Sequence, residues 1–202
     1  MGQAGGLYMY APFEIGTRFR ITPPGASAST DDRIDLTMAR GAFGSGEHET
    51  TASCIEALEK LPQLAGARIL DLGSGTGILA IAALKLGAAA ALCIDISPEA
   101  VAAARNNCAL NGITEGIEHF TGVLADAPAG VYDLVLANIY GDLLLDLAEE
   151  LVTRPRSGGL LLLSGMLWEY NFEVRQTYQR LGCTVLENRM LEEFSTVLLA
   201  KG

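Results

Sequence analysis

A regular alternation of short apolar runs and helix-forming segments begins at Arg68 and continues to the end of the chain. Short apolar runs bounded by turn residues are typical of buried strands, and the longer segments between them carry helix start and stop signals. Strands that alternate with helices predict an α/β fold, in which helices cover both faces of the sheet and the crossovers are right-handed. We therefore predict a doubly wound, mostly parallel sheet of seven strands.

The element boundaries follow from the same signals. Ser97-Pro98-Glu99 has the order of an N-cap, a first-turn proline and an acidic first turn, and Asn111-Gly112 provides a left-handed stop. Pro155 and Gly158-Gly159 are predicted to end a helix. The predicted strands are 68–72, 90–94, 132–137, 160–164, 183–187 and 196–200, with a seventh short strand around His119, and the predicted helices are 78–86, 98–110, 143–152 and 168–181.

The first part of the chain has a different character. Residues 1–40 are interpreted as an N-terminal leader or linker, a short β and loop extension in which 17–22 and 34–38 are candidate partners of a hairpin. Residues 41–202 form the main domain. This domain starts with a glycine-rich stretch and a helix predicted over 50–61.

Composition excludes several classes of function. The net charge is −10 and no basic stripe is present, which argues against direct nucleic-acid binding. The four cysteines form no Cys-x-x-Cys pair and there are two histidines, so no metal site is expected and a reducing cytoplasm fits. The apolar runs are too short to span a bilayer. We predict a cytoplasmic protein without a membrane segment.

The first predicted strand runs directly into a glycine-rich turn, Asp71-Leu72-Gly73-Ser74-Gly75-Thr76-Gly77, and a helix follows at once. In a doubly wound sheet, ligands bind beyond the carboxyl ends of the strands. Glycines there let the backbone approach a ligand closely, so Gly73 and Gly75 are candidate contacts. Asp95 ends the next strand, where a carboxylate can accept hydrogen bonds from both ribose hydroxyls. The pattern predicts a nucleoside site, with Ile96 as a further contact.

The glycine spacing and the preceding charge decide between two kinds of nucleoside ligand. A dinucleotide fingerprint reads Gly-x-Gly-x-x-Gly and holds pyrophosphate at a helix N-terminus. Here the spacing is Gly-x-Gly-x-Gly, and Asp71 stands before it. A carboxylate repels a diphosphate but attracts the cationic ammonium and sulfonium groups of S-adenosylmethionine. We predict this cofactor, with S-adenosylhomocysteine as the product; the alternative is a glycine-rich turn that binds nothing.

A second glycine-rich stretch, Ala42-Phe43-Gly44-Ser45-Gly46-Glu47-His48-Glu49-Thr50-Thr51, precedes the helix over 50–61. By composition alone it is a flexible surface loop. Together with segments farther along, it resembles the PrmA-type ribosomal protein methyltransferases. The matching segments are Ile69–Leu86, Cys93–Ala100, Asn107–Gly112, Ala137–Tyr140 and Gly158–Leu167. The resemblance covers most of the chain from about Pro12 to its end.

The resemblance implies a class I, Rossmann-like methyltransferase that trimethylates amino groups of the eleventh protein of the large ribosomal subunit. The implied partner is therefore a protein substrate. Matches to the family's cofactor contacts are Thr51, Gly73, Asp95 and Asn138, and Phe43 and Gly44 belong to the loop expected over the methionine end. Asn138 is also the candidate catalytic residue, because its amide oxygen can accept a hydrogen bond from an incoming amine.

Two features depart from the family. Its members carry an N-terminal substrate-recognition domain before the region seen here, so the chain is either a trimmed protein or a short relative with another acceptor. In addition, Thr121-Gly122-Val123-Leu124 stands where many such enzymes have an acidic adenine contact. Asp126 is displaced from that position by a few residues. Backbone groups around Val123 and Leu124 are the alternative contacts for adenine.

Other functions stay open at this point. They are a small-molecule methyltransferase on the same fold, a non-catalytic nucleoside-binding module, and a dinucleotide-dependent oxidoreductase or sensor, which Asp71 disfavours. His48 is interpreted as structural. Trp168 and Tyr170 fit an acceptor channel and ordinary helix packing equally well. The sequence sets neither the acceptor, the number of methyl groups transferred nor the oligomeric state.

Overall fold

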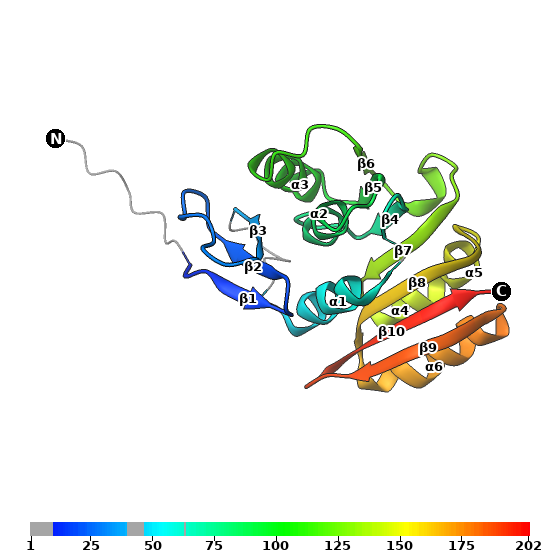
Figure 1. Cartoon of the computed structure of the whole chain (residues 1–202). Coiled ribbons are helices and arrows are strands. Elements are labelled where there is room, and N and C mark those ends of the chain that lie inside the picture. The colour runs from blue at the N-terminus through cyan, green and yellow to red at the C-terminus, as the bar shows by residue number, and fades with distance from the viewer. Residues whose placement is uncertain (1–9, 40–46, 63) are drawn as a thin grey trace.

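The computed structural model describes residues 10–39, 47–62 and 64–202. Figure 1 shows a large twisted sheet covered by helices, with a small second sheet beside it at the N-terminal end. The first elements are β1 (Phe13–Ile15), β2 (Phe19–Thr22), β3 (Ile34–Thr37) and α1 (Glu49–Lys60). The alternating part consists of β4 (Arg68–Leu72), α2 (Ile78–Lys85), β5 (Ala90–Asp95), α3 (Pro98–Leu110), β6 (Ile117–Thr121), a short 3-10 turn (Leu124–Asp126), β7 (Tyr132–Asn138), α4 (Gly141–Asp146), α5 (Ala148–Leu151), β8 (Pro155–Leu167), α6 (Trp168–Arg180), β9 (Cys183–Met190) and β10 (Phe194–Lys201).

The large sheet has the strand order β6-β5-β4-β7-β8-β10-β9. The first five strands in this order are parallel, whereas β10 runs antiparallel to both β8 and β9. The order reverses beside β4, because β5 and β6 lie on one side of it and β7 and β8 on the other. The predicted doubly wound, mostly parallel, seven-stranded sheet is confirmed. Its reversal point predicts a ligand crevice at the carboxyl ends of β4 and β7.

Alternate residues of the central strands pack against different helical layers. Ile69 and Leu134 belong to a core that they share with α1 and α2, whereas their neighbours Leu70 and Val135 belong to a second core with α4, α5 and α6. Side chains of a strand point alternately to opposite faces, so a sheet covered on both faces must be apolar on both. This explains why the strands read as continuous apolar runs.

The N-terminal segment forms a three-stranded sheet of order β1-β2-β3, and its apolar side chains join the core of α1 and α2. The strands predicted at 17–22 and 34–38 are present as β2 and β3. The hairpin prediction is wrong for this pair, because β2 and β3 run parallel. The antiparallel partner of β2 is β1. Parallel pairing needs a long crossover, and the segment from Pro23 to Arg33 supplies it.

Two boundaries in the alternating part also differ from prediction. The helix predicted over 143–152 is divided at Leu147 into α4 and α5. The strand predicted over 160–164 is much longer, so Pro155 and Gly158 lie in β8 and do not end the preceding helix. Proline is tolerated at the first residue of a strand. The pairing of β7 with β8 shifts register after Tyr132, and Gly158 lies in the irregular part of β8 with φ +70°. This left-handed conformation explains why the residue is a glycine.

Asn107 in α3 and Asn111, which caps the end of that helix, join the small sheet to the large one. The backbone N–H of Ala39, just after β3, donates to Asn107 Oδ1 at 2.9 Å, and Asn107 Nδ2 donates to the carbonyl oxygen of Thr76 at 3.0 Å. Asn111 Oδ1 accepts from the backbone N–H of Thr37 at 3.0 Å. Buried amides with satisfied hydrogen bonds fix a single arrangement. The chain that leads toward the second glycine-rich stretch is therefore held against the glycine-rich turn after β4.

Candidate active site

The glycine-rich turn after β4 has a conformation that its glycines make accessible. Gly73, Gly75 and Gly77 have φ values of +69°, +53° and +78°, in the left-handed region that side chains disfavour. The backbone N–H groups of Gly73 and Ser74 both donate to the carbonyl oxygen of Ile94, at 2.8 and 3.1 Å. The turn is thereby tied to the end of the neighbouring strand β5.

Gly73 also lies where two parts of the site meet. A Cβ atom placed on it would be 2.4 Å from Cγ2 of Ile139, at the end of β7. That distance is far inside van der Waals contact, so any larger residue would push the two strand ends apart. The absence of a side chain lets Ile139 pack directly on the backbone of Gly73, and both residues line the cavity described below.

Asp95, at the end of β5, holds the turn from the other side. Its Oδ2 accepts from the backbone N–H of Gly75 at 2.8 Å, and its Oδ1 accepts from the backbone N–H of Ser97 at 3.0 Å. Each carboxylate oxygen can accept a second hydrogen bond, and the side chain is only partly buried. Asp95 therefore fixes the loop and still has acceptor capacity. Ile96 follows it with 75% of its surface exposed.

Asp71, by contrast, is buried and incompletely paired. It is 1% exposed, and among the described residues its Oδ2 has no hydrogen-bond partner. The pKa of Asp71 is raised to about 7, chiefly by burial; a hydrogen bond from the backbone of Ala80 partly opposes the rise, and the charge of Asp95 adds to it. Ser74 Oγ is also buried without a partner in the described part of the chain. A buried acid without a counter-charge is a candidate for binding a cationic ligand.

A cavity of about 420 Å³ opens between these groups and the ends of β7, β8 and β10. Four of the predicted site residues line it: Thr51, Asp71, Gly73 and Asn138. Three other predicted residues are not part of the cavity wall. They are Gly75, in the turn after β4, and Asp95 and Ile96, at the end of β5. Phe43 and Gly44 fall outside the described residues.

Asn138 and Thr51 approach each other across the cavity from β7 and α1. Asn138 Nδ2 donates to Thr51 Oγ1 at 3.5 Å, the long limit of a hydrogen bond. Asn138 Oδ1 lies 3.0 Å from the position of a Cβ on Gly165, in β8. Gly165 has φ +83° and lines the cavity. Its missing side chain leaves room for the amide of Asn138.

Sequence reasoning missed several residues of the cavity wall. They are Thr50, Ser74, Thr76, Ile78, Leu79, Ile139, Tyr140, Leu143, Gly165 and Phe194. Gly165 had a readable signal, because a glycine directly after a buried apolar run marks a close approach. Phe194 had none, since it reaches the site only through the antiparallel return of β10. His48, interpreted as structural, accepts a hydrogen bond from the backbone of Thr50 as the N-cap of α1 and lies edge-on to Phe194 with ring centroids 4.9 Å apart.

Glu49, the first residue of α1, holds the turn between β9 and β10 against this wall. Its carboxylate accepts from the backbone N–H groups of Glu192, Glu193 and Phe194, at 2.8, 3.0 and 3.1 Å. Partial burial would raise the pKa of Glu49, but the three backbone hydrogen bonds outweigh burial and lower it. The carboxylate is therefore a fixed anchor for the chain that carries Phe194.

The site contains no obvious metal centre or nucleophilic pair. In residues 10–39, 47–62 and 64–202, no group of three or more His, Cys, Asp or Glu could hold a metal ion. Burial raises the pKa of the Cys54 thiol to about 12, so this cysteine is not an activated nucleophile. In the same residues, no helix combines the length and the apolarity needed to cross a membrane.

The geometry agrees with comparisons to known proteins. Residues 6–201 match the family described as "Ribosomal protein L11 methyltransferase (PrmA)". A ribosomal protein L11 methyltransferase of Geobacter metallireducens is 42% identical over 196 residues, which cover 96% of this chain and 64% of the relative. One from Pelobacter propionicus is 42% identical over 186 residues, 89% of this chain and 59% of the relative. The chain thus spans about three fifths of the length of these curated relatives.

A solved structure supports the fold over nearly the whole chain. The ribosomal protein L11 methylase of Lactobacillus delbrueckii subsp. bulgaricus superposes with a TM-score of 0.86 at 29% identity. The match covers 96% of this chain and 100% of that one. The small N-terminal sheet and the large sheet therefore have counterparts in a protein of similar architecture.

Proposed function

The chain belongs to the ribosomal protein L11 methyltransferase (PrmA) family, and from that premise we propose that it transfers methyl groups from S-adenosylmethionine to amino groups of a protein. We propose ribosomal protein L11, the substrate in the names of its relatives, as the acceptor. The reaction would take place in the cytoplasm, where ribosomal proteins are made. S-adenosylhomocysteine is the second product.

One observation carries the choice of cofactor. The carboxylate of Asp71 is buried at the cavity wall, and its Oδ2 lacks a partner among the described residues. A ligand with an ammonium group compensates this charge, whereas a pyrophosphate would add a second negative charge beside it. The position of Gly73 in the cavity wall, next to Asp71, is consistent with the same ligand. When bound, S-adenosylmethionine supplies a methyl group already activated by its sulfonium.

The remaining residues of the cofactor side would each contact a different part of the nucleoside. Asp95 would accept hydrogen bonds from the ribose hydroxyls with the lone pairs that Gly75 and Ser97 leave free. Ile96 is exposed next to it and would pack on the adenine ring. Backbone groups at Val123 would contact the adenine edge. Phe43 and Gly44 remain candidates for covering the methionine end.

The acceptor amine must be neutral and aligned to attack the methyl carbon. Asn138 would accept a hydrogen bond from the amine N–H through Oδ1, while its Nδ2 faces Thr51 Oγ1. This contact would point the nitrogen lone pair at the methyl group, and alignment of two reactants is a large part of catalysis in such a transfer. The apolar part of the wall, which includes Leu143 and Phe194, would disfavour a charged ammonium and so lower the pKa of a lysine acceptor.

Radiolabelled S-adenosylmethionine provides the test. The chain is incubated with the labelled cofactor and a lysate from a strain that lacks the protein, and the labelled species are identified by electrophoresis and mass spectrometry. Label on ribosomal protein L11 is the expected result. Label confined to small metabolites would reject the protein acceptor, and no label on any species would reject the transfer reaction.

The ribose contact is tested by Asp95→Ala. We expect the dissociation constant for S-adenosylmethionine to rise more than about 100-fold, because the variant loses an acceptor for two hydroxyls and the brace of the glycine turn. Calorimetry measures the affinity. The control is Asp126→Ala, which removes an exposed acid in the turn after β6 and should bind normally. Near-normal affinity in Asp95→Ala would remove Asp95 from the site.

A further inference from the structure

Large apolar side chains are exposed together beside the mouth of the cavity. They come from the start of α4 and from the junction of β8 with α6. Their exposed fractions are 68% for Tyr140, 43% for Leu143, 40% for Leu167, 51% for Trp168 and 62% for Phe172. We call these five residues the rim patch. Clustered exposed apolar residues on a soluble protein often mark a binding surface.

Contacts connect the rim patch to the cavity. Tyr140 and Leu143 are themselves part of the cavity wall. Leu167 is paired across the strands with Phe194, another wall residue. Trp168 Nε1 donates to the carbonyl oxygen of Leu191 at 3.2 Å, in the turn that leads to Phe194. Phe172 follows Trp168 by four residues on α6, on the same side of the helix.

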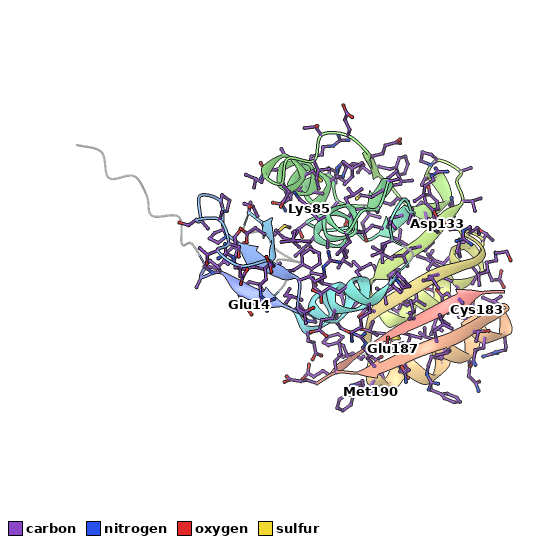
Figure 2. The ribbon with its side chains drawn as sticks, in the orientation of Figure 1. Glu14, Lys85, Asp133, Cys183, Glu187 and Met190 are labelled. Carbon is purple, nitrogen blue, oxygen red and sulfur yellow. The ribbon has the colours of Figure 1, made fainter. Side chains whose placement is uncertain are left out.

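The turn between β9 and β10 belongs to the same end of the sheet. Figure 2 places Asp133 and Cys183, at the starts of β7 and β9, toward one edge of the molecule. Met190, at the end of β9, lies away from Cys183, at the lower edge of the view. Because β10 runs antiparallel to both β8 and β9, β9 ends at the same edge of the sheet as the parallel strands, and the turn after it leads directly to Phe194 in the cavity wall.

Most of the charges around the rim patch are negative, and the arginines beside it are Arg175, three residues after Phe172 on α6, and Arg189, just before Met190. Exposed acids accompany it on all three segments: Asp142, Glu169, Glu173, Glu192 and Glu193. The stretches 139–150, 167–174 and 190–194 contain no lysine, arginine or histidine. In the described part of the chain, none of these five carboxylates forms an ion pair. The surface at the mouth is therefore apolar in its centre and predominantly negative around it.

We infer that the rim patch with its five acids is the docking surface for a flexible, lysine-rich segment of the acceptor protein that also carries apolar side chains. This inference rests on the proposed function. Lysines beside the acceptor lysine would neutralise the acids, and apolar side chains would cover Trp168 and Phe172. A second copy of this chain does not fit the surface, because self-association would bring like charges together.

The acids of the patch are tested by Glu169→Lys/Glu173→Lys. The matched control is Glu115→Lys/Glu118→Lys, which makes the same charge change on exposed residues around the start of β6. With ribosomal protein L11 as acceptor, we expect KM to rise about tenfold in the patch variant and to stay within about twofold in the control. The affinity for S-adenosylmethionine, measured separately, should be unchanged in both and shows that both are folded. Equal effects of the two variants on KM, or none, would overturn the docking surface.

The apolar part is tested by Phe172→Ala against Leu186→Ala, a control that removes another exposed apolar side chain, from β9. A rise of about threefold in KM for Phe172→Ala alone is expected, and equal values would overturn the assignment of this residue.

Direct binding separates a failure of the docking surface from a failure of the proposed function. Fluorescence anisotropy measures binding of a labelled lysine-rich peptide with interspersed leucines, and of the same peptide with every lysine replaced by glutamate. We expect the lysine-rich peptide to bind the unmodified chain and the glutamate peptide not to bind it. The lysine-rich peptide should bind the patch variant about tenfold more weakly than the unmodified chain. Absence of methyl transfer to L11 would reject the proposed function whatever the peptides do. Peptide binding that does not depend on Glu169 and Glu173 would overturn the docking surface whether or not transfer occurs.

Discussion

The two sides of the cavity are built by different means. On the cofactor side, one stretch of chain from Asp71 to Ser97 makes the glycine-rich turn and its brace, mainly through backbone N–H groups bound to Ile94 and Asp95. On the acceptor side, Asn138, Thr51 and Phe194 come from distant segments, and side-chain contacts bring them together. One side depends on local backbone conformation, the other on tertiary packing. Substitutions should therefore separate cofactor affinity from acceptor turnover.

Asn138→Ala should give the largest difference between the effect on turnover and the effect on cofactor affinity. We expect kcat to fall about 100-fold, because the variant loses the group that would align the amine, while the dissociation constant for S-adenosylmethionine rises only a few-fold. Single-turnover kinetics and calorimetry measure the two quantities. Thr51→Ser keeps the hydroxyl beside Asn138 and is the mild control. A loss of cofactor affinity as large as the loss of kcat would show that the two sides are not separable.

The titration of Asp71 predicts that cofactor affinity on its side of the cavity depends on pH. Its pKa is raised to about 7, so the free protein holds this carboxyl largely protonated below that pH, and a cationic ligand favours the carboxylate. Affinity for S-adenosylmethionine should therefore rise about tenfold between about pH 5.5 and pH 7.5, with uptake of the ligand coupled to proton release. Calorimetry in buffers of different ionisation enthalpy measures the released proton. Asp71→Asn should bind weakly and without this pH dependence.

The same shift affects the stability of the free protein. The unfolded chain loses the Asp71 proton near the ordinary pKa of 3.8, whereas the folded state keeps it to about pH 7. Because the folded state binds the proton more tightly, stability falls as the pH rises between these values and is constant above them. Urea unfolding at several pH values should show that the free energy of unfolding falls less steeply with pH in Asp71→Asn than in the unmodified chain. An identical pH slope in the two proteins would mean that Asp71 titrates normally.

The difference between the two sides also explains what could be predicted from the sequence. Asp71, Gly73 and Asp95 stand at fixed spacings on consecutive elements, so a local pattern sufficed to place them beside one another. The mostly parallel sheet and the two helical layers followed from the alternation of apolar runs, whereas the strand order was not predicted. Phe194 depends on how β8 and β10 pair, and no spacing in the chain encodes that register.

The N-terminal sheet illustrates the same limit. The strands near Phe19 and Ile34 were readable as extended segments, but their direction of pairing was not. Pairing depends on the path of the connection and on packing against α1 and α2. The role of Asn107, which bridges Ala39 and Thr76, was invisible for the same reason, because its partners are distant in the chain.

Glu49→Gln tests the acceptor side with the smallest expected effect. An amide keeps one oxygen but turns an N–H group toward a backbone N–H, so at least one of the three hydrogen bonds from Glu192, Glu193 and Phe194 is lost. The wall that carries Phe194 should loosen and raise KM for the acceptor about threefold, with kcat and cofactor affinity nearly unchanged. Glu56→Gln, on the same helix, is the matched control.

The pH dependence of this anchor separates a positioning role from a purely structural one. Because the pKa of Glu49 is lowered in the folded protein, the hydrogen bonds stabilise the fold above the ordinary value of 4.5 and are lost as the pH falls below it. The unmodified chain should therefore show a rise in acceptor KM toward low pH that Glu49→Gln already shows at neutral pH. Glu49→Asp, which keeps the charge on a shorter side chain, should restore part of the difference. If KM is unchanged while stability falls, the carboxylate braces the fold without positioning the cavity wall, and the acceptor side is more rigid than its scattered contacts imply.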